Sequence, residues 1–350
     1  MDEAWIEIAC PGPCAESRAA AEARQRQLTK PLGSLGALEA LAIRLASLQA
    51  TDRPRAAQVP IVLFAGDHGI TAQGVSAYPS VVTVQMLRNF AGGGAAIAVL
   101  ARELGSALSV VDAGTLAPAP IAGVIADKPR LGTRDFSQEP AMTAGELSFA
   151  LATGQRAIGR ATAGGADLVI LGEMGIGNTT AATAIAAALL GASVDDLVGA
   201  GTGLDAERVG RKARVITAAL KKHRLEAATP LSILAAVGGL EIAALTGAII
   251  AAAQARIPVL IDGFIVSVAA LAAARINPSC APWLIYSHRS LERGHQVVLD
   301  ALGGEPVLDL KLRLGEGTGA ALALPILRLS CALHTQMATF AEARISGPAA

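Results

Sequence analysis

Short apolar runs alternate with longer segments of helical periodicity along most of this chain. Runs of this length, continuous rather than alternating, are typical of strands buried on both faces of a parallel sheet. The apolar runs cover residues 59–65, 107–112, 121–127, 167–171, 257–262 and 282–286. The predicted helices cover residues 81–104, 143–164, 178–190, 206–223, 238–255, 263–275 and 290–302. This order predicts an α/β fold with a mostly parallel, Rossmann-like sheet and helices on both faces.

The two ends of the chain have a different pattern. Residues 15–49 show helical spacing with charges of both signs, and residues 318–343 are again predicted helix, with a kink or break at Pro325. Residues 51–59 interrupt the helical spacing as a connection would. We therefore predict a large α/β domain at 51–315 and a small helical domain formed by 1–50 together with 316–350. The pattern does not fix the strand order.

Composition narrows the possible partners. The 350 residues include 29 basic and 29 acidic side chains, and only 3% are aromatic, so neither a net positive field nor stacking surfaces favour nucleic acid. The uncharged stretches 242–255 and 263–274 are shorter than the roughly 20 residues of a membrane span. The first residues lack a basic segment followed by an apolar one, so we expect a cytoplasmic protein without a membrane span.

The cysteines and histidines do not predict a metal site. Cys10, Cys14, Cys280 and Cys331 are scattered, and Cys10-Pro-Gly-Pro-Cys14 lacks the spacing of a zinc site. We expect free thiols, and the sequence leaves the role of Cys10 and Cys14 open. Asp67 and His68 have no further ligand at suitable spacing, which favours a positioning role.

Glycine-rich segments follow the predicted strands, where ligands bind in open parallel sheets. Gly175-Ile-Gly-Asn-Thr-Thr180 opens an alanine-rich helix, so its N–H groups and hydroxyls could hold a phosphate. The alternative is that Asn178 or Thr179 only caps the helix. Residues 198–204 form a second glycine-rich loop, and Lys212 on the next helix could supply a cation.

A carboxylate between two glycines is the clearest candidate for chemistry. Glu316 lies between Gly315 and Gly317 at the start of an apolar helix. Glycine on both sides lets a ligand approach the main chain, and a carboxylate there can act as a general base. The alternative is an acidic residue favoured by the helix macrodipole.

Six motifs in order resemble the nicotinate-nucleotide:dimethylbenzimidazole phosphoribosyltransferases of cobalamin biosynthesis, from about residue 25 to 335. The motifs are Thr29-Lys-Pro-Leu-Gly-Ser-Leu-Gly36, Phe64-Ala-Gly-Asp-His-Gly69 with Gly74-Val-Ser-Ala-Tyr-Pro79 and Val82-Thr-Val-Gln-Met86, Gly172-Glu-Met-Gly-Ile-Gly-Asn-Thr-Thr180, Gly199-Ala-Gly-Thr-Gly203, Ile261-Asp-Gly-Phe264 and Leu314-Gly-Glu-Gly-Thr-Gly319. The resemblance implies transfer of the 5-phosphoribosyl group of nicotinate mononucleotide to 5,6-dimethylbenzimidazole, with inversion and with no metal or other cofactor. It also implies a homodimer.

The resemblance further implies a role for particular residues. Glu316 is then the general base that takes the imidazole proton. The implied base pocket consists of Tyr78, Ser80, Gln85, Met174 and Leu314. The implied nucleotide contacts are Glu173, Gly175, Gly177, Asn178, Thr179, Gly201, Thr202, Gly203, Lys212, Asp262 and Ser290. The preferred acceptor base stays open.

Two other functions remain to be weighed. A binding protein of the same fold, without catalysis, is expected to lose the acid at position 316 while keeping residues 175–180. A NAD-dependent oxidoreductase predicts Gly-x-Gly-x-x-Gly directly after the first strand, which Phe64-Ala-Gly-Asp-His-Gly69 does not provide.

Overall fold

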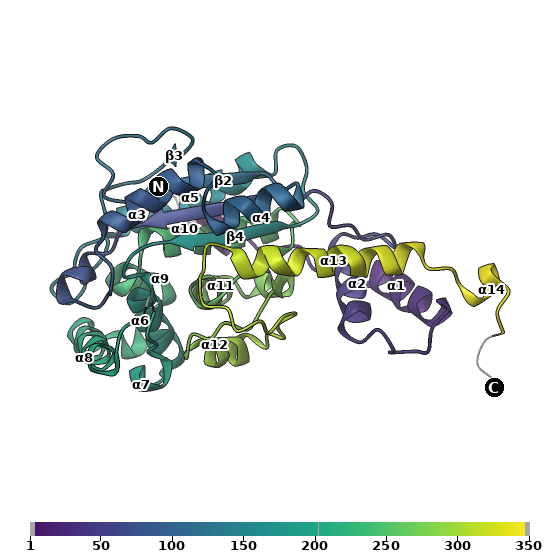
Figure 1. The fold of residues 1–350 in the computed structure, drawn as a ribbon. Coiled ribbons are helices and arrows are strands. Elements are labelled where there is room, and N and C mark those ends of the chain that lie inside the picture. Colours follow the sequence, from purple (N-terminus) through teal and green to yellow (C-terminus); the bar gives the residue numbers. More distant parts are fainter. Residues whose placement is uncertain (1–3, 202, 347–350) are drawn as a thin grey trace.

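The computed structural model describes residues 4–201 and 203–346, and its core is one sheet of six parallel strands in the order β3-β2-β1-β4-β5-β6 (Figure 1). The strands are β1 (Ile61–Gly66), β2 (Leu108–Gly114), β3 (Ile125–Ala126), β4 (Val169–Met174), β5 (Val259–Ile261) and β6 (Leu284–Tyr286). This confirms the predicted α/β fold. The order reverses between β1 and β4, which is where a crevice for ligands opens in such sheets.

Helices cover both faces of the sheet. The helices are α1 (Ala15–Gln27), α2 (Ala37–Leu48), α3 (Val81–Ala91), α4 (Ala96–Leu104), α5 (Ala144–Ala161), α6 (Asn178–Leu190), α7 (Val194–Leu197), α8 (Ala206–His223), α9 (Pro230–Val237), α10 (Leu240–Gln254), α11 (Phe264–Ile276), α12 (His295–Leu302), α13 (Thr318–Gln336) and α14 (Phe340–Ala343). Helices α5 and α10 pack together on one face, and α4 and α13 lie on the other (Figure 1).

Several predicted boundaries are wrong. The predicted helix 81–104 is two helices, because Gly92, Gly93 and Gly94 interrupt it and Gly93 has a φ of 79°. No break occurs at Pro325, which lies inside α13. Helix α12 begins at His295 instead of residue 290, and α7 and α9 were not predicted.

The terminal helices form a group beside the sheet. Helices α1 and α2 pack against each other and α2 packs on α13, whose second half extends away from the sheet (Figure 1). Residues 4–11 contact the α/β part instead: Asn277 Nδ2 donates to the carbonyl of Ile6 at 2.8 Å, and Trp283 Nε1 donates to that of Pro11 at 2.9 Å. The division into two domains at residues 50 and 316 stays a prediction.

The structure bears on two further predictions, which concern membrane-spanning helices and the state of the cysteines. Within residues 4–201 and 203–346, no helix is long and apolar enough to cross a membrane. All four cysteines are free thiols. Cys14 caps α1, because its Sγ accepts a hydrogen bond from the Ser17 N–H at 3.5 Å.

Candidate active site

A cavity of about 680 Å³ opens at the carboxyl end of the sheet. Its walls come from the segments that follow β1, β4, β5 and β6, together with residues 311–316. Acidic, basic, hydroxyl and amide side chains line the cavity together with apolar ones. This mixture of an apolar wall and a few polar groups is typical of a small-molecule site.

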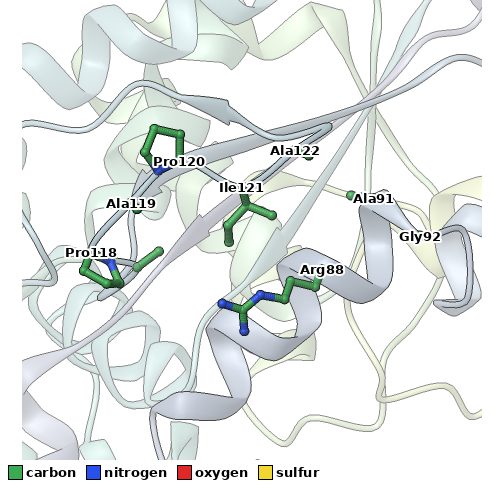
Figure 2. A pocket seen from close by; sticks show the side chains of 9 residues that line it. Arg88, Ala91, Gly92, Pro118, Ala119, Pro120, Ile121 and Ala122 are labelled. Atoms are coloured by element: carbon green, nitrogen blue, oxygen red, sulfur yellow. The ribbon is translucent and has the colours of Figure 1, made fainter.

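A second hollow, of about 560 Å³, lies between α3 and residues 117–122 (Figure 2). Figure 2 shows the Ile121 side chain pointing toward Arg88, with Pro118 and Pro120 beside it. Arg88 is the one charged side chain among its described lining residues, and none of the predicted site residues lies there. We therefore take the cavity at the sheet's carboxyl end as the candidate active site.

Glu316 lies in that cavity on an unusual stretch of backbone. Gly315, Glu316 and Gly317 have φ angles of 88°, 65° and 84°, so three successive residues are left-handed. A glutamate in this region is strained, by of order 1–3 kcal/mol. The loop is held against β4, since a Cβ on Gly172 would lie 2.4 Å from the Glu316 carbonyl oxygen. Close packing on the strand therefore sets the position of Glu316.

Asp262 holds the loop of residues 315–317 through hydrogen bonds to its backbone and to the start of α13. Its two carboxylate oxygens accept the N–H groups of Gly317 at 3.1 Å and Ala320 at 2.9 Å, in the first turn of α13. Asp262 was predicted to contact the nucleotide, but it does not line the cavity. Asp262 instead caps the N-terminus of α13 from outside the cavity lining. These hydrogen bonds hold in place the helix that begins next to Glu316.

The Glu316 carboxylate is buried but incompletely paired. Burial raises its pKa to about 7, while a hydrogen bond from the Ile97 backbone N–H lowers it and the nearby Asp262 charge raises it. Its Oε2 atom has no hydrogen-bond partner among the residues that the structure describes. A carboxylate with a pKa close to neutral can be ionised and still accept a proton readily, as a general base must.

Glu173, at the end of β4, is the second buried acid of the cavity. Its Oε2 accepts a hydrogen bond from Asn178 Nδ2, and a Cβ on Gly315 would lie 2.4 Å from its Oε1. Burial raises the pKa of Glu173 to about 8, and the charges of Asp262, Glu241 and Glu316 add to the effect. Glu173 is therefore largely protonated at neutral pH.

The two glycine-rich loops meet at the N-terminus of α6. Lys212 Nζ, which is buried, donates to Thr179 Oγ1 at 2.8 Å, and a Cβ on Gly201 would lie 2.9 Å from the same oxygen. Burial lowers the pKa of Lys212 to about 8. Gly177 is the N-cap residue of α6 and makes no side-chain cap. The N–H groups of Asn178 and Thr180 donate to the carbonyls of Gly175 and Gly177 at 3.1 and 2.9 Å, which leaves the Thr179 N–H of this first turn for a ligand. Neither Asn178 nor Thr179 acts as the N-cap.

The apolar part of the cavity is built on α3 and the segments beside it. Tyr78, Met174 and Leu314 line it as predicted, together with Val82 and Met86. Tyr78 and Leu314 are 53% and 58% exposed, so they lie at the mouth. Ser80 and Gln85 do not line the cavity. Ser80 Oγ is 3.1 Å from Thr71 Oγ1, and the Gln85 side chain is exposed.

Most of the predicted site residues come together. Those that line the cavity are Tyr78, Glu173, Met174, Gly175, Asn178, Thr179, Gly201, Ser290, Leu314 and Glu316. Those outside its lining are Ser80, Gln85, Gly177, Gly203, Lys212 and Asp262. Thr202 lies outside the described residues. Direct contact of any of these residues with a ligand stays a prediction.

The sequence analysis missed several lining residues. The i, i+4 spacing of Val82 and Met86 on a helix that follows a glycine-rich strand end could have indicated them. Phe264 and His288 also follow strand ends, and both line the cavity. Glu292 and Arg313 carried no such signal, because their place depends on where residues 287–315 return to the sheet.

A histidine and a glutamate brace the loops behind the cavity. His68 Nε2 is 2.6 Å from Glu241 Oε1, and both side chains are fully buried. Glycines surround the pair, since a Cβ on Gly175 would lie 3.3 Å from both of these atoms. In the described part of the chain, no group of three or more His, Cys, Asp or Glu side chains could hold a metal ion. The positioning role expected for His68 stays a prediction, which its contact with Glu241 supports.

Comparison with known proteins gives one consistent result. A family model described as phosphoribosyltransferase matches residues 10–345. The chain is 66% identical, over 98% of both chains, to a protein of Bradyrhizobium sp. (strain ORS 278), and 56% identical, over 99% of both, to one of Pseudomonas putida KT2440. Both are named nicotinate-nucleotide–dimethylbenzimidazole phosphoribosyltransferase. The crystal structure of the Thermus thermophilus protein of that name is 44% identical, with a TM-score of 0.91 and coverage of 96% and 100%.

Proposed function

The chain belongs to the nicotinate-nucleotide–dimethylbenzimidazole phosphoribosyltransferase family, and from that premise we propose that it makes α-ribazole 5′-phosphate and nicotinate from nicotinate mononucleotide and 5,6-dimethylbenzimidazole. It is a phosphoribosyltransferase by family, and the proposal adds its two substrates, the inversion at the anomeric carbon and Glu316 as the general base. Among the alternatives, catalysis is preferred to a binding-only role because the acid at position 316 is present and buried in the cavity.

The proposed reaction exchanges one bond at the anomeric carbon for another. The bond from C1′ to the nicotinate ring nitrogen breaks, and its electron pair leaves with nicotinate, which departs without the positive charge of the pyridinium. A nitrogen of dimethylbenzimidazole forms the new bond from the opposite face, so the β configuration becomes α. The imidazole N–H proton passes to Glu316. Because the leaving group is already activated, orientation of the two rings is the main task of the protein.

The state of Glu316 is the observation that carries the proposal. The carboxylate is buried, its pKa is raised to about 7, and one oxygen has no partner in the described part of the chain. A general base must keep one oxygen for the substrate's proton.

The cavity offers a place for each part of the substrates. We assign dimethylbenzimidazole to the apolar part, between Val82, Met86 and Leu314. We assign the nucleotide's phosphate to the N-terminus of α6, where Thr179 and the Lys212 behind it supply donors. Glu316 lies in the wall of the same cavity, which supports its assignment as the residue that takes the proton of the acceptor base.

Product analysis with a Glu316 variant tests the proposal. Purified protein with both substrates and no metal should release nicotinate and form α-ribazole 5′-phosphate in equal amounts. Glu316→Gln should bind nicotinate mononucleotide normally but turn over about 100-fold or more slowly, the usual scale for a lost general base. Glu103→Gln, which changes an exposed acid on α4, is the control. Near-normal turnover in the Glu316 variant would remove the base role.

Two outcomes separate the remaining alternatives. If the folded protein binds the nucleotide but forms neither product, it is a binding protein or uses another acceptor base. Supplying adenine or a phenolic base in place of dimethylbenzimidazole distinguishes those cases. We also propose a homodimer, which sedimentation of the purified chain would confirm or refute.

A further inference from the structure

His288 is the one basic side chain that is both buried and in the cavity wall, among the described lining residues. It is 4% exposed and follows β6 directly. Lys311 and Arg313 also line the cavity, but both are exposed at its rim, and Lys212 lies behind Thr179. The mechanism proposed above does not use His288.

The imidazole ring of His288 is held in one orientation. A Cβ on Gly319 would lie 2.0 Å from its Nδ1 and 2.1 Å from its Cε1, so the ring lies directly on the backbone of α13. On Gly263, a Cβ would lie 3.5 Å from Cε1. Only glycine at position 319 allows this contact. A ring fixed in this way presents the same nitrogen to a ligand in every molecule.

The neighbours of Nδ1 leave Nε2 for a ligand. Nδ1 is 3.1 Å from Ser287 Oγ and 3.7 Å from Asp262 Oδ1. When the Ser287 hydroxyl donates to Nδ1, the ring is in the tautomer whose Nε2 carries the proton. In that tautomer Nε2 can donate a hydrogen bond to an anion.

His295 holds the next segment of the wall beside His288. The Ser290 N–H donates to His295 Nδ1 at 2.9 Å, and His295 Nε2 is 3.0 Å from Ser267 Oγ. Burial lowers the pKa of His295 to about 3, so its ring is neutral. Because Nδ1 accepts a hydrogen bond, the proton lies on Nε2, and this N–H donates to Ser267 Oγ. The backbone of Ser290, another lining residue, is thereby fixed next to His288.

Charge in the cavity decides which group of the nucleotide fits His288. Glu173, Glu292 and Glu316 all line the cavity, so a ligand carboxylate there needs a positive or donating partner. The phosphate is already assigned to the N-terminus of α6. The nicotinate carboxylate is the other anionic group of the nucleotide, and Phe264 and Ile265, which line the same cavity as His288, offer an apolar surface to its ring.

We propose that Nε2 of His288 donates a hydrogen bond to the nicotinate carboxylate and so selects nicotinate mononucleotide over its carboxamide analogue, nicotinamide mononucleotide. This inference rests on the proposed function. It adds to that function a residue that touches the leaving group and determines which pyridine nucleotide is used.

Two substitutions at position 288 test the contact. Asn keeps a polar atom near the place of Nδ1 but loses Nε2, whereas Gln can place an N–H donor near Nε2. His288→Asn should raise the dissociation constant of nicotinate mononucleotide about tenfold or more, the usual scale for losing a hydrogen bond to a charged group. It should change binding of nicotinamide mononucleotide less than about threefold. His288→Gln should recover part of the selectivity.

Calorimetric titration of both nucleotides measures these effects without turnover, and product analysis of the wild type separately tests the proposed function. Equal losses for the two nucleotides would overturn the inference, because a structural role affects both alike. If the variants do not fold, the contact can be tested in the wild type by NMR, through magnetisation transfer between the protons of the bound nucleotide and those of the protein. Bound nicotinate ring protons should then show a contact to a histidine Cε1–H, and its absence would overturn the inference.

Discussion

Three glutamates face the cavity, and each meets different neighbours. Glu316 has one backbone donor and a free oxygen, and Glu173 shares a hydrogen bond with Asn178. Burial raises the pKa of Glu292, although the charges of Lys212 and Arg313 oppose this. Of these three, Glu316 alone combines a pKa near neutral with a buried oxygen that has no hydrogen-bond partner in the described part of the chain. This difference in surroundings separates the proposed base from the two other acids.

The rate should depend on pH through Glu316. The base acts only when ionised, and its pKa is about 7, so kcat/KM should rise about tenfold per pH unit below 7 and level off above it. Steady-state rates of the wild type between pH 5.5 and 8.5 measure this. In Glu316→Gln the same inflection should disappear. A flat wild-type profile across that range would contradict the assignment.

Glu173 should make stability depend on pH in a predictable direction. Its folded-state pKa, about 8, is above the ordinary value of 4.5, so the folded protein holds a proton that the unfolded chain releases. Stability from this group is therefore lost as pH rises from about 4.5 to about 8. Glu173→Gln, which keeps an uncharged acceptor for Asn178, should unfold at higher temperature than the wild type at pH 8.5 and at a similar temperature at pH 5.

Thermal unfolding of both proteins at the two pH values checks this expectation, with Glu103→Gln as a surface control. A Glu173 variant that is equally destabilised at both pH values would mean that its contact with Asn178, rather than its proton, dominates. Activity should fall in the same variant, because Glu173 lines the cavity.

The sequence predicted some of these residues and could not predict others. Two flanking glycines mark Glu316, since glycine is needed where the backbone is left-handed and tightly packed. Asp262 differs: its capping contacts with α13 join residues 55 and 58 positions apart. Such a contact depends on the return of the chain to the sheet, which no local pattern encodes. Glu292 and Arg313 were missed for the same reason, whereas His288 follows β6 closely and its place could have been predicted.

At the scale of elements, α5 and α10 touch through their backbones. A Cβ on Gly154 would lie 1.9 Å from the Ala244 carbonyl oxygen, and one on Gly247 would lie 2.1 Å from that of Leu151. Each helix therefore places a glycine where the other passes. This crossing brings α10 onto β1 and β4, where Glu241 at its start meets His68.

A single methyl group at that crossing should be costly. Gly154→Ala should destabilise the protein by about 1–3 kcal/mol or more, because two packed helices must separate. Gly159→Ala is the matched control on the same helix: that glycine is exposed and has nothing within 4 Å of an added Cβ. It should stabilise by about 0.5–1 kcal/mol. Urea unfolding of both variants measures the difference, and equal effects would contradict the packing argument.

Periodicity predicted the six strands and most helices of the sheet, but not where every helix ends. Three glycines after Ala91 stop α3, although the apolar spacing continues. At Pro325 the sequence predicted a kink or break, but the helix α13 continues through this residue. A proline inside a helix usually destabilises it by about 3 kcal/mol. Packing of α13 on α4 and α2 outweighs this local cost.

At the scale of the whole molecule, α13 connects the cavity with the terminal helices. It begins beside Glu316, and at its other end Arg24 of α1 donates to the carbonyls of His334, Thr335 and Met337 at 2.7, 3.2 and 3.1 Å. A guanidinium that satisfies the last carbonyls of a helix also offsets its macrodipole. These bonds tie α1 to the end of α13.

Arg24→Ala should loosen the terminal helices and spare the sheet. We expect faster amide hydrogen exchange in α1 and in the last turn of α13, by about tenfold for each 1.4 kcal/mol of local stability lost. Exchange in β1 and β4 should not change. Arg18→Ala is the control, because its pair with Glu22 is exposed and contributes little. Equal acceleration throughout the sheet would contradict the predicted division into two domains.

The left-handed backbone of residues 315–317 also bears on how this protein would respond to selection. Glycine adopts that conformation without strain and glutamate adopts it at a cost, so Glu316→Gly removes strain together with the carboxylate. A library sorted only for thermostability or expression should therefore enrich glycine at position 316 and discard the proposed base. Engineering that aims at a more robust catalyst needs a turnover assay in every round, since the most stable chain and the most active chain differ at this position.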